Sequence, residues 1–90
     1  GMGGCMKWLG KNIKYPTIAQ ENGVQGRVIV QFVVTKEGNI EEPVVANGVD
    51  PYLDAEALRV IKAMPKWKPG KQRGKEVNVK YTLPIHFRLQ

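Results

Sequence analysis

The amino-acid sequence predicts an α+β domain, in which a three-stranded antiparallel sheet packs against one helix and short helices precede the sheet. Two stretches of alternating apolar residues, at 27–34 and 76–89, predict two of the strands. A run of apolar residues at helical spacing between them, at 50–64, predicts the covering helix. The 90 residues suffice for one domain with a single modest core.

The first part of the chain predicts a short helix or turn before the sheet. Apolar residues recur at helical spacing there, and Pro16 ends the pattern: Met6, Leu9 and Ile13. The opening GMGG resembles the remnant of an expression tag. We therefore expect two parts: residues 1–14, a tag remnant with an N-terminal helical arm, and residues 15–90, the folded domain.

Residues 27–34 predict a central strand, because apolar side chains occupy both of its faces. Gly38 lies where a hairpin loop needs a left-handed residue. The strand that returns from this loop carries Pro43, which cannot donate a ladder hydrogen bond. We expect this returning strand to be an edge strand or a bulged one.

Asp50 and Pro51 predict the start of the covering helix, as N-cap and first helical residue. One face is apolar: Leu53, Ala57, Val60, Ile61 and Met64. Three charged residues are expected to face solvent: Glu56, Arg59 and Lys62. In the last strand Pro84 interrupts the alternation, which indicates an exposed edge or a bulge.

A basic loop joins the helix to the last strand, and two interpretations compete for it. Trp67 lies between two prolines, among five basic residues: Lys66, Lys68, Lys71, Arg73 and Lys75. A net charge of +6 attracts polyanions of any kind, so it does not decide for nucleic acid. Because the basic residues cluster in a loop and the sheet lacks paired aromatics, a rigid connection anchored by Trp67 is favoured, with no nucleic-acid partner.

The residues for catalysis or metal binding are scarce. The chain has one cysteine, Cys5, one histidine, His86, and no serine. A zinc cluster would lack ligands, and no nucleophile–base pair or phosphate-binding glycine motif is present. Cys5 is expected to be an exposed or half-buried bystander. We expect neither an enzyme nor a metal or cofactor site.

The order and spacing of several short motifs resemble the C-terminal domain of the TonB family over residues 15–90. The matching features are Tyr15-Pro16, Ala19, Gly26, Val28, Gly38, Asp54, Ala57, the segment P-K-W-K-P-G, Gly74 and the closing P-I-H-F-R-L. The wording YPTIAQENG is similar to versions from Bacteroidetes-type organisms. Each fragment alone is weak, but their combined order is specific.

This resemblance implies a periplasmic domain of an inner-membrane energy transducer whose anchor helix and proline-rich spacer lie upstream. In the family the anchor works with the ExbB–ExbD proton channel. The domain grips the TonB box of outer-membrane transporters, so that the proton gradient drives uptake of siderophores or other nutrients. The alternative is a TonB-like recognition or dimerisation module fused to a membrane sensor or peptidase. Only the upstream sequence would distinguish this alternative from an energy transducer.

The expected binding mode is β-augmentation, because a small sheet with a free edge offers unpaired N–H and C=O groups to an extended peptide. The resemblance makes the last strand that edge: Glu76, Val77, Asn78, Val79, Lys80, Tyr81 and Thr82. It also adds the stretch that meets the transporter plug, although the glutamine-rich wording of enteric versions is absent: Asn12, Ile13, Lys14 and Tyr15. An unoccupied edge can recruit its twin, so a homodimer through the last strand stays open.

Overall fold

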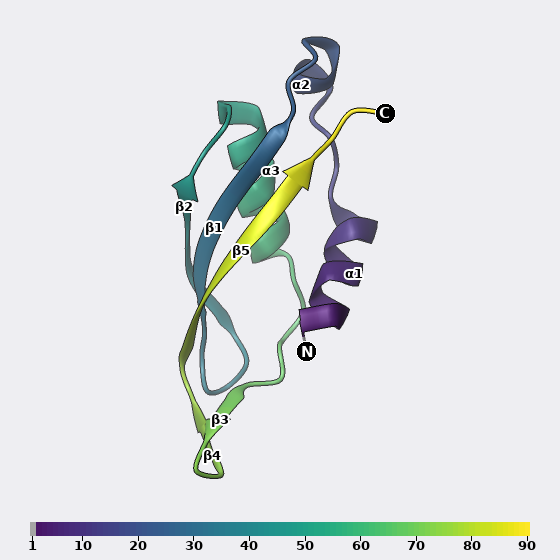
Figure 1. The fold of residues 1–90 in the computed structure, drawn as a ribbon. Helices are drawn as coiled ribbons and strands as arrows, with labels where there is room; N and C mark the ends of the chain where they lie inside the picture. Colours follow the sequence, from purple (N-terminus) through teal and green to yellow (C-terminus); the bar gives the residue numbers. More distant parts are fainter. Residues whose placement is uncertain (1) are drawn as a thin grey trace.

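The computed structural model describes residues 2–90, and Gly1, part of the expected tag remnant, lies outside them. The elements in chain order are α1 (Met2–Asn12), α2 (Thr17–Glu21), β1 (Gly26–Val34), β2 (Ile40–Asn47), α3 (Pro51–Lys62), β3 (Gly70–Gln72), β4 (Lys75–Val77) and β5 (Val79–Phe87). Strands β2, β1 and β5 form one antiparallel sheet in that order, and α3 covers one of its faces (Figure 1). The expected fold class is confirmed.

The core lies between α3 and the face of the sheet that we call inner. Alternate residues of β1 and β5 are buried there: Val28, Val30, Phe32, Val34, Leu83, Ile85 and Phe87. The predicted apolar stripe of α3 is buried against them, and each large side chain contributes about 2 kcal/mol by its burial. The Asp50 carboxylate accepts from the backbone N–H of Tyr52 at 2.9 Å and of Leu53 at 3.0 Å, so the predicted cap is confirmed.

Helix α1 packs through Cys5 and Leu9, which are one helical turn apart and both buried. The Cys5 thiol lies 3.6 Å from Met64 Sδ, and burial raises its pKa. The expectation of an exposed or half-buried Cys5 is therefore wrong. Met6 is exposed, because the helix turns the Cys5–Leu9 side towards the core and leaves Met6 outside.

The two edges of the sheet differ in regularity. The pairing of β2 with β1 shifts register twice, and Glu42, beside Pro43, has a φ of 54°. Strand β5 instead pairs with β1 in one continuous register, from Val34 opposite Val79 to Gly26 opposite Phe87. The expectation of an irregular edge strand is confirmed for β2, whereas Pro84 lies in an edge strand without a bulge.

The last strand begins later than the sequence predicts. Glu76 and Val77 were expected in it, but they belong to β4, which pairs with β3. Arg73 and Gly74 form the two-residue turn between these strands with φ of 52° and 79°, as a type I′ hairpin requires. The hairpin lies at the opposite end from α2 in a domain that extends 48 × 22 × 15 Å (Figure 1).

Candidate functional site

The free side of β5 is the candidate site. Within residues 2–90 β5 pairs with β1 alone, so its other side has no neighbouring strand. Pro84 has no N–H, and a proline within a regular edge strand directs its nitrogen to solvent. Because backbone groups alternate along a strand, we infer that Lys80, Thr82 and His86 also direct their N–H and C=O groups outward.

The side chains along this edge are polar on one face and aromatic on the other. Lys80 and Thr82 are exposed on the outer face, away from α3. Tyr81 is half-buried on the inner face, where its ring stacks on that of Phe32 at 6.0 Å and is tilted against that of Trp67 at 4.8 Å. Because Phe32 lies opposite Tyr81 across β1 and β5, the expectation of a sheet without paired aromatics is wrong. The edge therefore offers main-chain groups between a polar face and an aromatic one.

Trp67 fixes the basic loop to the sheet, as predicted. Its backbone N–H donates to the carbonyl of Gly38 at 2.9 Å, and its ring meets Phe32 edge-on at 5.6 Å. The side chain of Asn78 makes a second tie to the same hairpin, because its Oδ1 accepts from the N–H of Lys36 at 2.8 Å. These two ties set the position from which β5 starts.

The predicted residues before Tyr15-Pro16 are held by a buried carboxylate. Glu56 Oε2 accepts from the backbone N–H of Lys14 at 2.7 Å. Arg59 donates to both oxygens of Glu56, at 2.6 and 2.8 Å, and to the carbonyl of Asn12 at 3.2 Å. The expectation that Glu56 faces solvent is wrong, because this arm crosses α3 and covers it.

The charge of Glu56 is stabilised where it lies. Burial raises the pKa of its carboxyl, but hydrogen bonds from Arg59 and from the N–H of Lys14, together with their positive charges, outweigh burial and hold the pKa below its ordinary value. Glu56 is therefore ionised at neutral pH. No sequence signal showed this clamp: Glu56 and Arg59 have helical spacing, but nothing in the pattern places the arm over them.

Tyr15 marks the far end of β5. Its hydroxyl donates to the carbonyl of Val24, and its ring lies edge-on to Phe87 at 5.6 Å. The structure thus places Tyr15 beside the last residue of β5, and Glu76 and Val77 before its first. Between them lies the nine-residue strand β5, whose eight steps of about 3.4 Å span about 27 Å. An extended segment along β5 would reach both.

The remaining features that the sequence singled out lie on the surface. His86 is exposed on β5, and the loop residues Lys66, Lys68, Lys71, Arg73 and Lys75 are exposed to solvent. Among the described residues no group of three or more histidine, cysteine, aspartate or glutamate side chains could hold a metal ion. No described helix is long and apolar enough to cross a membrane.

Two solved structures share this fold. The solution structure of Helicobacter pylori TonB-CTD matches with a TM-score of 0.73 at 23% identity, covering 94% of this chain and 77% of that chain. A shorter form of the same domain matches with a TM-score of 0.74 at 24% identity, covering 97% and 91%. The fold is that of TonB C-terminal domains.

The family follows from the sequence comparison. The family described as Gram-negative bacterial TonB protein C-terminal matches residues 11–89, and the chain belongs to it. Protein TonB of Pseudomonas aeruginosa is 33% identical over 78 residues, 84% of this chain and 22% of that protein. Protein TonB of Vibrio cholerae is 31% identical over 78 residues, 86% and 32%. The chain spans less than a third of the length of these curated relatives.

Proposed function

We propose that this domain is the periplasmic, non-catalytic part of an inner-membrane-anchored TonB energy transducer. It binds the TonB box of outer-membrane transporters as an added strand along β5. An anchor helix upstream would engage ExbB–ExbD, so that the proton gradient drives import through the bound transporter. The observation that carries this proposal is the continuous register of β5 against β1, beside a side that has no partner among residues 2–90.

The other edge of the sheet is a poorer template. The backbone of β2 shifts register twice, contains Pro43, and has Glu42 at a positive φ. Such irregularities are the devices by which edge strands avoid pairing with another chain. The contrast favours β5 as the edge that accepts a strand.

The proposed contact residues are those that the sequence predicted, and we assign each group of them a different role from its place along β5. Lys80 and Thr82 offer outward main-chain groups, and Val79 and Tyr81 frame them on the inner face. Glu76, Val77 and Asn78 lie just beyond the start of β5. The arm would contact the other end of the bound segment through Asn12, Ile13, Lys14 and Tyr15.

An NMR titration of the labelled domain with TonB-box peptides from transporters of the source organism tests this proposal. We expect saturable shifts along Val79–Thr82 and at Tyr15, seen neither with a scrambled peptide nor with a short oligonucleotide. Shifts that follow β2, or a response to the oligonucleotide alone, would overturn it. A spanning helix and proline-rich spacer upstream would support transduction, whereas several spanning helices would indicate the sensor or peptidase alternative.

A backbone variant sharpens the test. Thr82→Pro removes one outward N–H at a position equivalent to that of Pro84, which β5 already accommodates, so the fold is expected to survive. Loss of one hydrogen bond predicts weakening of box-peptide binding by about three- to tenfold. Thr82→Val keeps the N–H and changes only the exposed side chain, so it is the matched control.

A further inference from the structure

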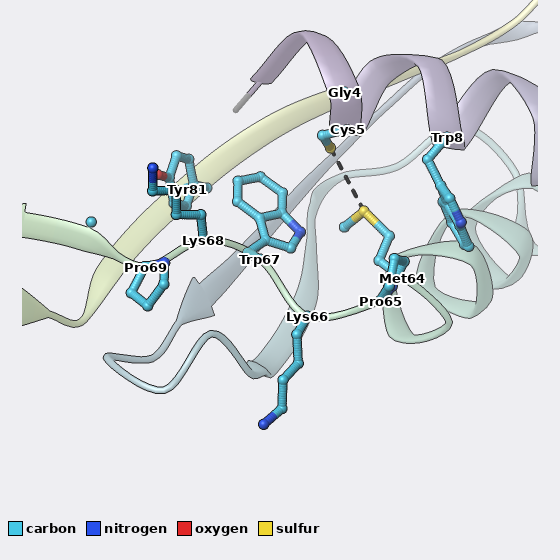
Figure 2. Close-up of a pocket in the computed structure, with 11 residues that line it drawn as sticks. Gly4, Cys5, Trp8, Met64, Pro65, Lys66, Trp67, Lys68, Pro69 and Tyr81 are labelled. Atoms are coloured by element: carbon cyan, nitrogen blue, oxygen red, sulfur yellow. Dashed lines mark hydrogen bonds between the residues drawn. The ribbon is translucent and has the colours of Figure 1, made fainter.

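A cavity of about 490 Å³ opens beside β5, on the inner face (Figure 2). Three segments line it: α1 through Cys5 and Trp8, the connection after α3 through Met64, Trp67 and Pro69, and β5 through Tyr81. Figure 2 shows the Trp67 ring between Tyr81 on one side and the Cys5–Met64 contact on the other. The volume of the cavity lies within the roughly 300–1,000 Å³ typical of small-molecule sites.

The lining indicates the chemistry of an occupant. Trp8, Trp67 and Tyr81 are each half-buried, so their rings are partly available to a ligand. Among residues 2–90 the charged residues of the lining are Lys66 and Lys68, both exposed, and no acidic residue lines the cavity. In Figure 2 Lys66 extends away from the aromatic rings. A large apolar group therefore fits the aromatic walls, and negative charge beside it fits the two lysines of the rim.

Strand geometry connects this cavity to the edge of β5. In a strand added to β5, side chains would alternate between the outer face, which carries Lys80 and Thr82, and the inner face, which carries Tyr81. The residue that lies beside Tyr81 would thus point towards the cavity. An added strand would therefore place one side chain at the mouth of the cavity, beside Tyr81, and the fold of the domain would not need to change.

We propose that this cavity is a specificity pocket for a large apolar side chain of the bound peptide strand, preferably one with acidic neighbours. This inference rests on the proposed function, because β5 must hold the strand that presents the side chain. Helix α1 supplies one wall through Cys5 and Trp8, which lie before the family match at 11–89, so this wall is outside the part of the chain that the family match covers.

The pocket is tested first without any peptide. N-acetyl-phenylalanine carries an aromatic ring and a carboxylate, its amide lacks the charge, and N-acetyl-alanine lacks the ring. The chain's two tryptophans, Trp8 and Trp67, both line the pocket, so their indole N–H signals report occupancy directly. We expect saturable shifts of both signals with N-acetyl-phenylalanine, several-fold weaker binding of the amide, and no response to N-acetyl-alanine.

Two glycines of α1 provide a blocking variant and its control. A Cβ added at Gly4 or at Gly3 meets nothing within 4 Å, but only Gly4 lines the pocket. Gly4→Leu is therefore expected to weaken N-acetyl-phenylalanine binding by about tenfold or more, while Gly3→Leu, with the same gain in helix propensity, leaves it unchanged. Equal effects of the two variants, or no saturable shift in the unmodified domain, would overturn the pocket.

The link to the peptide is tested by a scan. The tightest box peptide is resynthesised with phenylalanine and then alanine at each position in turn. We expect one position at which phenylalanine binds about tenfold tighter, an advantage that Gly4→Leu removes. If no position shows this advantage, the pocket is not part of the peptide site. Thr82→Pro separates the two ideas, because it weakens peptide binding through β5 and leaves N-acetyl-phenylalanine binding intact.

Discussion

Substituting Glu56 tests whether the arm before Tyr15 is fixed by one buried carboxylate. Glu56→Gln keeps an acceptor for the Lys14 N–H but loses the charge that strengthens this bond and both bonds from Arg59. A hydrogen bond to a charged group contributes about 1.5–3 kcal/mol and a neutral one about 0.5–1.5 kcal/mol. Because the Arg59 side chain is about half exposed, we discount its share and expect Glu56→Gln to cost about 1–2 kcal/mol.

The pH dependence of this loss has a definite sign. The folded state holds the pKa of Glu56 below its ordinary value of 4.5, so the carboxylate stabilises the fold above that pH. The contribution is lost as the pH falls through the lower pKa of the folded state, because protonation then costs the folded domain its charged interactions. The difference in unfolding free energy between the unmodified domain and Glu56→Gln should therefore narrow below pH 4.5.

Urea unfolding followed by tryptophan fluorescence, at pH 7 and at several values below 4.5, measures both effects. Glu37→Gln removes an exposed carboxylate from the β1–β2 turn and is the matched control, with an expected change within about 0.5 kcal/mol. If Glu56→Gln costs no more than Glu37→Gln at pH 7, or if its cost is constant with pH, the clamp is not the stabilising interaction that its geometry indicates.

Three further predictions concern Gly38 in the β1–β2 hairpin, the Cys5 thiol, and the basic residues Lys71 and Arg73 of the β3–β4 hairpin. Gly38→Ala should cost about 2 kcal/mol or more in thermal unfolding, because φ is 89° and a Cβ would lie 2.3 Å from the Trp67 carbonyl oxygen; a cost below 0.5 kcal/mol contradicts the close approach. Cys5 should react with a disulfide reagent at pH 7 at least about tenfold more slowly in the folded domain than in urea, because burial raises its pKa; equal rates contradict this. Reversing both Lys71 and Arg73 to glutamate should lower the association rate of acidic peptides severalfold at low salt while changing dissociation little, as stopped-flow measurements would show; an effect that persists at high salt argues against steering.

The sequence predicts most of the fold because its main signals are local. Alternation in β1, the apolar stripe of α3 and the Asp50 cap each depend on residues that are neighbours in the chain. The β3–β4 hairpin was missed because Arg73 has a left-handed backbone that its residue type rarely adopts, so the stretch was predicted as part of the basic loop. Glu56 was expected to face solvent because no local signal shows its burial, which depends on contact with the arm at Lys14, 42 residues away in the chain.

The candidate site likewise has one part that local signals predict and one part that depends on the tertiary fold. The open edge could be predicted, because Pro84 in the last strand indicates an exposed edge or a bulge and the resemblance to the TonB family makes that strand the edge. The cavity beside Tyr81 could not, because its walls come from three segments that only the tertiary fold brings together. The approach of Cys5 to Met64 spans 59 residues, and the helical spacing of Met6, Leu9 and Ile13 pointed to a face of the helix that excludes Cys5 and includes the exposed Met6.

Pro84 limits how much of β5 an added strand can use. It has no N–H, so a carbonyl placed opposite it would remain without a donor, at a cost of about 1–3 kcal/mol if that carbonyl is buried. A partner strand is therefore best satisfied when its main-chain pairing is confined to the part of β5 before Pro84, where Lys80 and Thr82 supply the outward donors, and the rest of the bound segment continues towards Tyr15 without pairing to β5. Tyr81 lies between these two residues, and its ring lines the cavity. The main-chain geometry and the pocket thus select the same short stretch of β5, which makes this half of the strand, and not its whole length, the place where specificity is expected to arise.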